Sequence, residues 1–340
     1  MRTAVEPESR EEASAPSPSP SSEGAAPFYY MPAEWGPRRQ TWMGWPTRAD
    51  VWPNGGREAK EAVTALAGEI ARGGEAVTVL ASPGASAGEA RAAFAGNGRV
   101  RVVEAAMDDV WLRDTGPIFL KQRGGEDRGA VAGVAWRFNG WGGKFPPWDK
   151  DAAVAAFILQ AEGLRLVDRR RHVLEGGSVH VDGVGTLLAT ESCLLNGNRN
   201  PTLSKQQIER VLCETLGVAK IIWLPAGLLC DTDTDGHVDN FACFAREGVV
   251  LLAWCEDQCG DPQQHRVCAE AEAILLGETD AEGRPLEVVC VPLPPPLHYT
   301  REEAEAIEGG ARTPGEQICA SYINFCWNGD HRVIIPGFGA

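Results

Sequence analysis

Between two apolar, strand-like runs lies the stretch Asp231-Thr-Asp-Thr-Asp-Gly-His-Val-Asp-Asn240. The runs are Ile221-Ile-Trp-Leu-Pro225 before it and Phe241-Ala-Cys-Phe244 after it. Its first half matches the opening D-x-D-x-D-G of an EF-hand calcium loop, but Ala242 occupies the twelfth position, where that loop needs a bidentate Glu. An EF-hand loop also joins two helices rather than two strands. The stretch therefore predicts a polar connection between strands and argues against a calcium site.

His237 and Asp239 carry the chemistry of this stretch. They are two residues apart, and in an extended strand such residues point to the same face. A histidine and a carboxylate on one face can transfer protons and bind a cation. The alternative is a turn capped by Asp side chains with a solvated histidine. In either case Asp231, Asp233 and Asp235 are expected in turns or loops.

Length and composition restrict the class of protein. The 340 residues allow one large domain or two. Residues 1–27 are rich in Ser and Pro, so we expect a disordered tail before a catalytic domain at 28–340. The tail is acidic and has no apolar central stretch, which argues against a transit or signal peptide and favours a cytoplasmic protein. No apolar run approaches the ~20 residues of a membrane span.

Net charge and cysteine content narrow the possible partners. A formal charge of −15 argues against nucleic acid and anionic membranes, and it suits a cationic substrate. The 10 cysteines are expected to be buried thiols rather than disulfides. Cys255, Cys259, His265 and Cys268 have a loosely zinc-like spacing, but the paired C-x2-C knuckles of common zinc modules are missing. We therefore expect no metal.

Short β-rich runs alternate with Ala-rich helical stretches, which indicates an α/β or α+β fold. Helices are predicted at 58–72, 149–162 and 204–216, and strands at 41–45, 76–80, 100–103, 219–224 and 248–254. Distinctive polar segments begin near Trp42, Asp108, Glu175 and Gly236, about 60 to 70 residues apart. This spacing suggests a repeated supersecondary unit.

Three further segments hold candidate functional residues. Asp114 precedes a Gly-Pro turn, Trp141 lies in the loop Phe138-Asn-Gly-Trp-Gly-Gly-Lys144, and Glu175 precedes two glycines that would let the backbone approach a ligand. Each has a structural alternative: Asp114 as a turn cap, Trp141 as surface packing, and Glu175 as the partner of an arginine.

Taken together, these segments resemble agmatine deiminases, which group with bacterial-type peptidylarginine deiminases in the protein-arginine deiminase family. The motifs are MPAEW (31–35), TWMGWP (41–46), DDVWLRDTGP (108–117), FNGWGGK (138–144), LEGGS (174–178), ATESCLLNGNRNP (189–201) and GHVDN (236–240). The resemblance runs from about Tyr30 to Ala340. It implies the pentein fold, an α/β propeller of five ββαβ units with pseudo-fivefold symmetry around a narrow active site.

The resemblance also implies roles for the candidate residues. Asp114 and Asp239 would hold the guanidinium of agmatine, because a planar, permanently charged group is best held by carboxylates. His237 would be the general acid and base. Glu175 would be a further acidic contact or would orient His237. Trp111 and Trp141 would line the aliphatic chain of the substrate.

The implied reaction is hydrolysis of agmatine to N-carbamoylputrescine and ammonia, a step of putrescine and polyamine biosynthesis. Family members use a cysteine thiolate that forms a covalent thiouronium intermediate, which water resolves. No metal or organic cofactor is implied. The expected partner is a small cationic guanidino compound, and a homodimer is implied.

One motif of the family has no counterpart here. Its nucleophile lies near the C-terminus in a segment close to G-G-G-N-I-H-C, whereas this sequence matches through Val333-Ile-Ile-Pro-Gly-Phe-Gly339 and stops at Ala340. We therefore expect an incomplete last unit, no nucleophilic Cys, poor solubility from an unpaired edge, and no appreciable turnover. The nucleophile role is carried over to neither Cys193 nor Cys326.

Several interpretations stay open at this point. One is a shortened form of a genuine agmatine deiminase, and another is a guanidinium-binding pseudoenzyme. A third is a peptidylarginine deiminase of the same family. The last is an acidic metal-binding module built on the discounted calcium-like and zinc-like segments.

Overall fold

The computed structural model describes residues 28–124, 127–256, 261–308, 311–329 and 332–338. The predicted tail at 1–27 lies outside these residues, so its disorder stays a prediction. Cys259, one member of the zinc-like set, also lies outside them.

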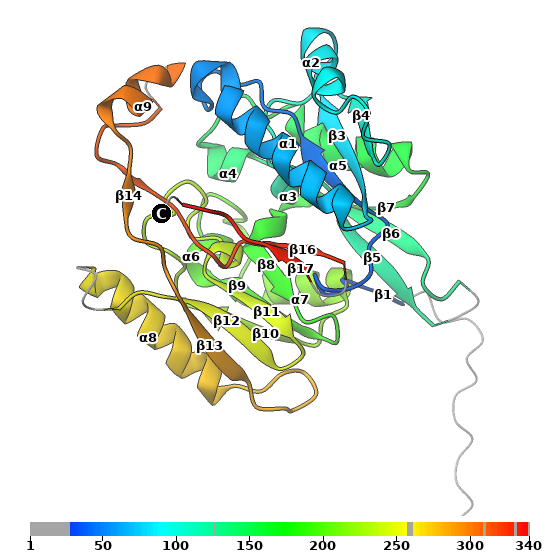
Figure 1. Ribbon diagram of the computed structural model, residues 1–340. Coiled ribbons are helices and arrows are strands. Elements are labelled where there is room, and N and C mark those ends of the chain that lie inside the picture. The colour runs from blue at the N-terminus through cyan, green and yellow to red at the C-terminus, as the bar shows by residue number, and fades with distance from the viewer. Residues whose placement is uncertain (1–27, 125–126, 257–260, 309–310, 330–331, 339–340) are drawn as a thin grey trace, which may run out of the picture.

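Three successive units share one plan: an antiparallel strand pair, a helix, and a third strand parallel to the second (Figure 1). The first contains β5 (Ile118–Arg123), β6 (Val131–Arg137), α5 (Asp151–Ala161) and β7 (Arg165–Val173). The second contains β8 (Val179–Val181), β9 (Thr186–Thr190), α7 (Lys205–Leu216) and β10 (Lys220–Leu224). The third contains β11 (Ala242–Arg246), β12 (Val249–Trp254), α8 (Pro262–Gly277) and β13 (Glu287–Pro292). The predicted repeat of a supersecondary unit is present in these three sheets.

The N-terminal part forms a fourth, parallel sheet. Its elements are β2 (Gln40–Gly44), η1 (Pro53–Gly56), α1 (Arg57–Arg72), β3 (Ala76–Ala81), α2 (Ala85–Ala93) and β4 (Val100–Glu104). The strands run parallel in the order β2-β3-β4, because each connection passes through a helix. A short strand, β1 (Phe28–Tyr30), pairs instead with β5.

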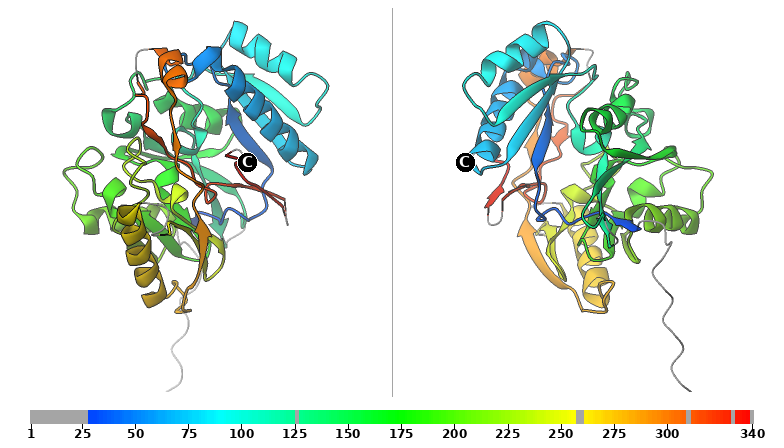
Figure 2. Two further views of the ribbon diagram at one scale, coloured as in Figure 1. Left: turned by 60° about the vertical axis from the view of Figure 1, so that its left-hand side comes forward. Right: turned by 90° about the vertical axis from the view of Figure 1, so that its right-hand side faces the viewer.

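The C-terminal part packs against the N-terminal part. It contains β14 (Leu297–His298), α9 (Arg301–Ala306), β15 (Gln317–Ile318), β16 (Cys326–Asn328) and β17 (Arg332–Ile334). Cys326 is the first residue of β16. Asn328 Nδ2 donates to the carbonyl of Glu69 on α1 over 3.0 Å, and both views in Figure 2 place the β16–β17 pair beside the N-terminal segments. The two parts thereby share one apolar core.

Local chemistry explains why the predicted helices begin and end where they do. Ser204 accepts a hydrogen bond from the backbone N–H of Gln207 over 3.3 Å, and the Gln207 side chain accepts one from the Ser204 N–H over 2.8 Å. This reciprocal cap fixes the first turn of α7. Gly217, at φ 66°, ends the helix in the left-handed conformation that glycine adopts without strain.

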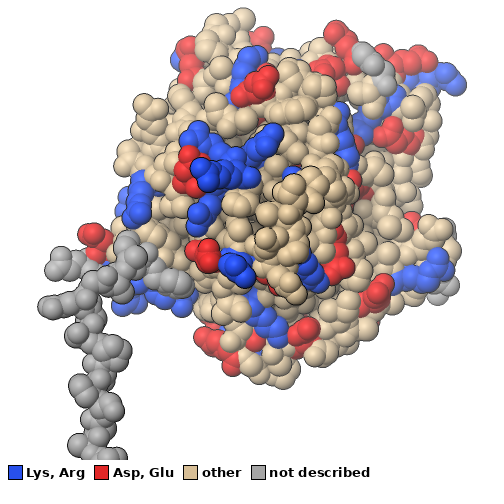
Figure 3. All heavy atoms as spheres, turned by 180° about the vertical axis from the view of Figure 1, so that it is seen from behind, with Lys and Arg blue, Asp and Glu red and all other residues tan. Residues whose placement is uncertain are grey.

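Positive charge is unevenly distributed on the surface. On the face seen in Figure 3, Lys and Arg side chains gather in one area although the whole chain is acidic. The strand β7 contributes exposed positions at Arg165, Arg170 and Arg171. The net charge therefore does not describe each face of the molecule. Among the described residues, no helix is long and apolar enough to cross a membrane.

Candidate active site

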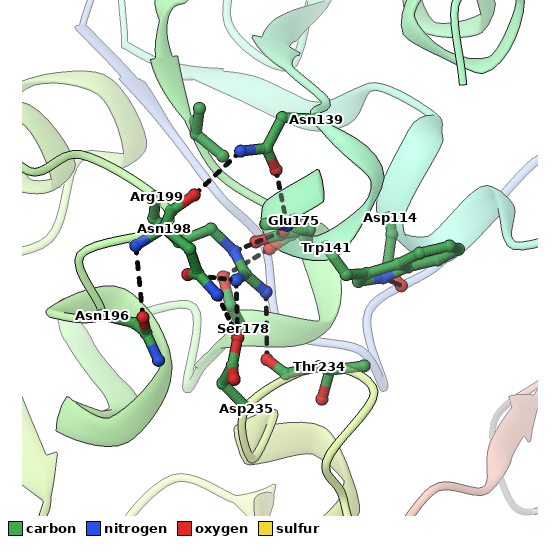
Figure 4. Close-up of polar contacts among 12 residues, drawn as sticks. Asp114, Asn139, Trp141, Glu175, Ser178, Asn196, Asn198, Arg199, Thr234 and Asp235 are labelled. Carbon is green, nitrogen blue, oxygen red and sulfur yellow. Dashed lines mark hydrogen bonds and ion pairs between the residues drawn. The ribbon is translucent and has the colours of Figure 1, made fainter. Parts of the chain in front are cut away.

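Five short segments that follow strands meet near the middle of the fold. They are α3 (Leu112–Thr115), α4 (Gly140–Gly143), η2 (Gly176–Ser178), α6 (Glu191–Leu194) and η3 (Val238–Asn240). The segments that carry Asp114, Trp141, Glu175 and Asp235 converge in Figure 4. The structure thus gathers residues that the sequence placed in four separate motifs.

Gly177 lies at the point where three of the predicted residues converge. A Cβ added to Gly177 would sit 2.6 Å from Asp239 Oδ2, 2.6 Å from His237 Nδ1 and 2.9 Å from Asp114 Oδ1. The backbone N–H of Gly177 donates to Asp114 Oδ1 over 2.9 Å. Only glycine leaves room for these atoms, because real Cβ contacts are never so short. Asp114, His237 and Asp239 therefore surround one small volume.

The prediction that His237 and Asp239 share one face of an extended strand is wrong. The two residues do not lie in an extended strand, since Val238–Asn240 forms a 3-10 turn and His237 precedes it with φ −54° and ψ 140°. The turn, rather than strand alternation, brings both side chains to Gly177. The alternative of a solvated histidine is also wrong, because the residue is only 2% exposed.

Asp231 holds the loop that carries His237. Its buried carboxylate accepts hydrogen bonds from the His237 N–H over 3.1 Å, from Thr234 Oγ1 over 2.5 Å and from Asn240 Nδ2 over 3.2 Å. This is the capping role expected of an Asp in a turn. The prediction that Asp231 is a turn residue is confirmed, and its carboxylate is occupied by loop contacts.

Trp141 is buried against Asp114. Its indole Nε1 donates to Asp114 Oδ2 over 3.0 Å, and the Phe138 ring meets it edge-on at 4.9 Å. Trp141 takes the left-handed conformation at φ 54°, and Asn139 Oδ1 secures the same turn by accepting from Gly142 N over 2.9 Å. Trp141 is therefore not a surface-packing residue.

Trp111 lies in a different environment from Trp141. It is 44% exposed and stacks on Trp52, with ring centroids 5.6 Å apart and planes 28° apart. It immediately precedes α3, which carries Asp114. Of the two tryptophans predicted to line the aliphatic chain of the substrate, Trp141 is buried in contact with Asp114 and Trp111 is exposed.

Glu175 forms a fully buried ion pair that sequence reasoning offered only as an alternative. Arg199 Nε donates to Glu175 Oε1 over 2.7 Å, and neither side chain is exposed (Figure 4). Arg199 Nη1 also donates to Asp235 Oδ2 over 2.8 Å. Arg199 lies in the motif ATESCLLNGNRNP, and local spacing does not indicate that it pairs with Glu175.

Asp235 links this ion pair to the aromatic loop. Its carboxylate accepts from Lys144 Nζ over 2.7 Å and from Asn198 Nδ2 over 2.9 Å, in addition to Arg199. The expected loop position of Asp235 is confirmed, with φ 66°. Asp233 pairs instead with Arg312. Within residues 231–240, the other acidic side chains hold the loop in place through contacts with neighbouring residues. Only the carboxylate of Asp239 lies beside Gly177.

Three buried polar atoms of the site have no hydrogen-bond partner among the described residues: Glu175 Oε2, His237 Nε2 and Asp239 Oδ1. Buried polar atoms are rarely left unpaired unless a ligand or water meets them. The three unpaired atoms belong to His237 and Asp239, which meet at Gly177, and to Glu175, the partner of Arg199. The two carboxylate oxygens can accept hydrogen bonds from a ligand, and His237 Nε2 can donate or accept one according to its protonation state.

Burial and mutual charge shift the pKa values of these groups. Burial, helped by the neighbouring charge of Asp114 and opposed by His237, raises the pKa of Asp239 to about 7. Burial disfavours the imidazolium of His237, but Asp114, Cys193 and Asp239 outweigh it and raise its pKa well above the usual value. Burial also raises the pKa of Glu175, against the opposing charge of Arg199. The site thus favours a protonated His237 beside acidic groups.

Besides the zinc-like set of the sequence analysis, three side chains of the site carry atoms that could coordinate a metal ion. The Sγ of Cys193, a carboxylate oxygen of Glu175 and a ring nitrogen of His237 all lie within 4.8 Å of one another. The chemistry of this set is compatible with a metal ion, but Arg199 already occupies Glu175 Oε1 and places a positive charge there. In the predicted zinc-like set, His265 Nδ1 lies 2.6 Å from the carbonyl of Cys255, so that nitrogen is engaged with the backbone.

The family described as Porphyromonas-type peptidyl-arginine deiminase matches residues 30–340. The chain belongs to this family, a group of α/β hydrolytic enzymes. It is 49% identical over 320 residues to an agmatine deiminase of Stutzerimonas stutzeri (strain A1501), covering 92% of this chain and 84% of that protein. It is 48% identical over 305 residues to one from Ectopseudomonas mendocina (strain ymp), with 87% and 80% covered.

Solved structures show the same relationship. The agmatine deiminase of Enterococcus faecalis superposes with a TM-score of 0.82 at 38% identity, covering 91% of this chain and 84% of that chain. This similarity confirms the predicted α/β class and extends over most of both chains.

Proposed function

We propose that this chain is an agmatine deiminase, which hydrolyses the guanidinium of agmatine to N-carbamoylputrescine and ammonia. One observation carries the proposal: Asp114, His237 and Asp239 converge on Gly177. Proteins named agmatine deiminase that are 48–49% identical to this chain support it. The product fits a place in putrescine formation.

The carboxylates of Asp114 and Asp239 form the proposed clamp. Their oxygens approach the same point beside Gly177, where a flat guanidinium can donate to both. Asp114 is already oriented by the indole of Trp141 and the N–H of Gly177, so little side-chain entropy is lost on binding. Asp239 Oδ1, which has no partner among the described residues, offers a further acceptor.

His237 is the proposed acid and base. After a nucleophile has added to the guanidinium carbon, a protonated His237 gives its proton to the departing nitrogen, which leaves as ammonia. The neutral ring then takes a proton from the water whose oxygen bonds to that carbon and displaces the nucleophile. The sum is agmatine plus water yielding N-carbamoylputrescine plus ammonia. Glu175 favours the charged form of the ring from nearby. No described residue is assigned as the nucleophile of the covalent step.

Burial favours a small substrate over a peptidyl arginine. His237 and Glu175 are almost completely enclosed, and Trp141 is buried beside the clamp. A free agmatine can be surrounded in such a site, whereas an arginine within a folded polypeptide would bring its backbone against the exposed rim near Trp111. The peptidylarginine alternative remains the second candidate, because the matching family carries that description.

The repeated units favour a pentein propeller as the complete architecture. Three ββαβ units are followed by the β14–β15 pair and the β16–β17 pair, and the parallel β2-β3-β4 sheet packs near the latter. We propose that these remaining pairs and the N-terminal sheet contribute to the fourth and fifth units around the same centre.

The deciding experiment separates binding from turnover. Agmatine binding is measured by calorimetry, and N-carbamoylputrescine and ammonia are quantified in the same preparation. Free arginine and an arginine-containing peptide serve as competing substrates. We expect agmatine to bind both to the unaltered chain and to His237→Gln. Conversion by the unaltered chain would show that the expectation of no appreciable turnover is wrong, and His237→Gln should abolish that conversion. Binding without conversion by the unaltered chain would favour a guanidinium-binding pseudoenzyme, and preference for the peptide would favour the second candidate. Failure of agmatine to bind would overturn the proposal.

A further inference from the structure

Cys193 is a buried thiol that the proposed reaction does not use. It lies on α6 and no part of it is exposed to solvent. Its Sγ lies within 4.8 Å of both a carboxylate oxygen of Glu175 and a ring nitrogen of His237. The α6 segment therefore brings a sulfur atom to the imidazole that we assigned to acid and base chemistry.

Each of the two neighbours of this sulfur has one polar atom without a hydrogen-bond partner among the described residues. Glu175 Oε2 and His237 Nε2 are both unpaired among the described residues, and the other ring nitrogen, Nδ1, lies 3.8 Å from Asp114 Oδ1. The thiol contact with His237 is consequently weak, as expected for a group that is a poor donor and a poor acceptor. Like the charge of Asp114, the thiol raises the pKa of His237, whereas burial lowers it.

Two hydrogen bonds fix the position of α6 relative to the histidine loop. Thr190 Oγ1, just before α6, donates to the carbonyl of Gly236 over 2.6 Å. Ser192 Oγ donates to the carbonyl of Asp235 over 2.8 Å. Both acceptors immediately precede His237 in the chain. The sulfur of Cys193 therefore cannot move away from the ring unless these bonds break.

We infer that Cys193 is a positioning residue for His237. The thiol of Cys193 accepts a hydrogen bond from the charged imidazole ring and donates one to the neutral ring. A thiol can act in both ways, because the S–H is a donor and the sulfur an acceptor. An ionised carboxylate such as Glu175 can only accept, so it favours the charged ring alone. The inference rests on the proposed role of His237 as a group that changes its protonation state.

The surroundings keep the thiol in the form that this role requires. Burial raises the pKa of Cys193, so the sulfur retains its proton at neutral pH, although His237 opposes the effect. The ionisable groups that face His237 are Asp114 on α3, Glu175 before η2, Asp239 in η3 and Cys193 itself. The three carboxyl groups favour a charged ring, and so on balance does the thiol, which can also donate its proton to the ring once the ring is neutral.

The test compares Cys193→Val, which replaces the thiol by a somewhat larger apolar side chain without a polar hydrogen, with Cys193→Ser, which keeps a donor and an acceptor. The ring nitrogens of His237 are titrated by NMR in ligand-free protein with labelled histidine, and His237→Gln assigns the signal. We expect Cys193→Val to lower the pKa of His237 by about 0.5 to 1 and to mix the neutral tautomers. Cys193→Ser should keep the pKa close to that of the unaltered chain.

Cys268→Val is the matched control, because Cys268 is equally buried but lies on α8. It should leave the titration of His237 unchanged. Where agmatine is converted, Cys193→Val should lower kcat about tenfold with KM within about twofold. An unchanged titration in Cys193→Val, or in Cys193→Ala if the valine variant does not fold, would overturn the inference, as would an equal shift in Cys268→Val. Because the titration needs no agmatine, its result is independent of the proposed substrate.

Discussion

Trp141 Nε1 donates a hydrogen bond to Asp114 Oδ2 over 3.0 Å, and this bond joins the aromatic loop to the acidic motif that follows β4. The opposite oxygen of the same carboxylate accepts from the backbone of Gly177 over 2.9 Å. Asp114 is thus held at both oxygens before any ligand arrives. A carboxylate fixed in this way can meet a planar cation with little further ordering.

Replacing Trp141 by Phe removes the donor and keeps most of the ring. We expect agmatine affinity to fall about tenfold, because one oxygen of Asp114 loses its orientation, and the free energy of unfolding to fall by about 1 kcal/mol. Calorimetry and chemical denaturation give the two values. Trp136→Phe is the control, since the buried Nε1 of Trp136 has no hydrogen-bond partner among the described residues. Equal losses in both variants would contradict this role of the bond.

Arg199→Met leaves Glu175 as a buried carboxylate without its cation. We expect a loss of about 3 kcal/mol in the free energy of unfolding, because removing one member of a buried pair strands the other. The double variant Glu175→Gln, Arg199→Met should lose less than the two single variants together. Arg170→Met breaks the exposed pair with Asp168 and should leave the free energy of unfolding nearly unchanged, because solvent screens such a pair. Additive losses would show that Glu175 and Arg199 do not act as a pair.

Gly177→Ala places a methyl group among Asp114, His237 and Asp239. We expect agmatine binding to be lost by a factor of about 100 or more, because the methyl fills the volume where these side chains converge. Gly197→Ala is the control, since nothing lies within 4 Å of a Cβ at that position. Far-ultraviolet circular dichroism checks that both variants fold. Normal binding by Gly177→Ala would place the guanidinium elsewhere.

The raised pKa of Asp239, about 7, predicts a pH-dependent stability. An unfolded Asp ionises near about 4, so between about pH 4 and pH 7 the folded chain holds a proton that the unfolded chain lacks. The free energy of unfolding should therefore fall as the pH rises through this window, by at most about 4 kcal/mol from this group. In Asp239→Asn this contribution disappears. Denaturation curves at pH 5 and pH 8 give the change in the free energy of unfolding between the two pH values for each protein. The same change in the unaltered chain and in Asp239→Asn would contradict the prediction.

The same carboxylate should link agmatine binding to proton release. A guanidinium is held best by an ionised Asp239, so agmatine affinity should rise as the pH rises through about 7. Below that pH, binding should release a proton, which calorimetry detects in buffers of different ionisation enthalpy. Asp239→Asn should bind more weakly and without this release. Affinity that stays constant between pH 6 and pH 8 would count against Asp239 as a clamp residue.

The local pattern of the sequence predicted much of the fold. The spacing of apolar residues located α1, α7 and β12 within a residue or two, because helical and strand periods are properties of neighbouring residues. The spacing of apolar residues does not predict that the C-terminal β16–β17 pair packs against α1. This packing depends on Asn328 meeting Glu69, far away in the chain.

In the candidate site, too, some features could be predicted from the sequence and others depend on tertiary contacts. The sequence by itself determined which residue types were available: the carboxylates of Asp114 and Asp239, the imidazole of His237, and the acidic loop of Asp231. Only the tertiary structure decided that these groups meet at Gly177, that Arg199 neutralises Glu175, and that Cys193 lies beside the imidazole. The physical reason is that burial and the distances between distant segments set pKa values and pairing, and neither quantity is encoded in local spacing.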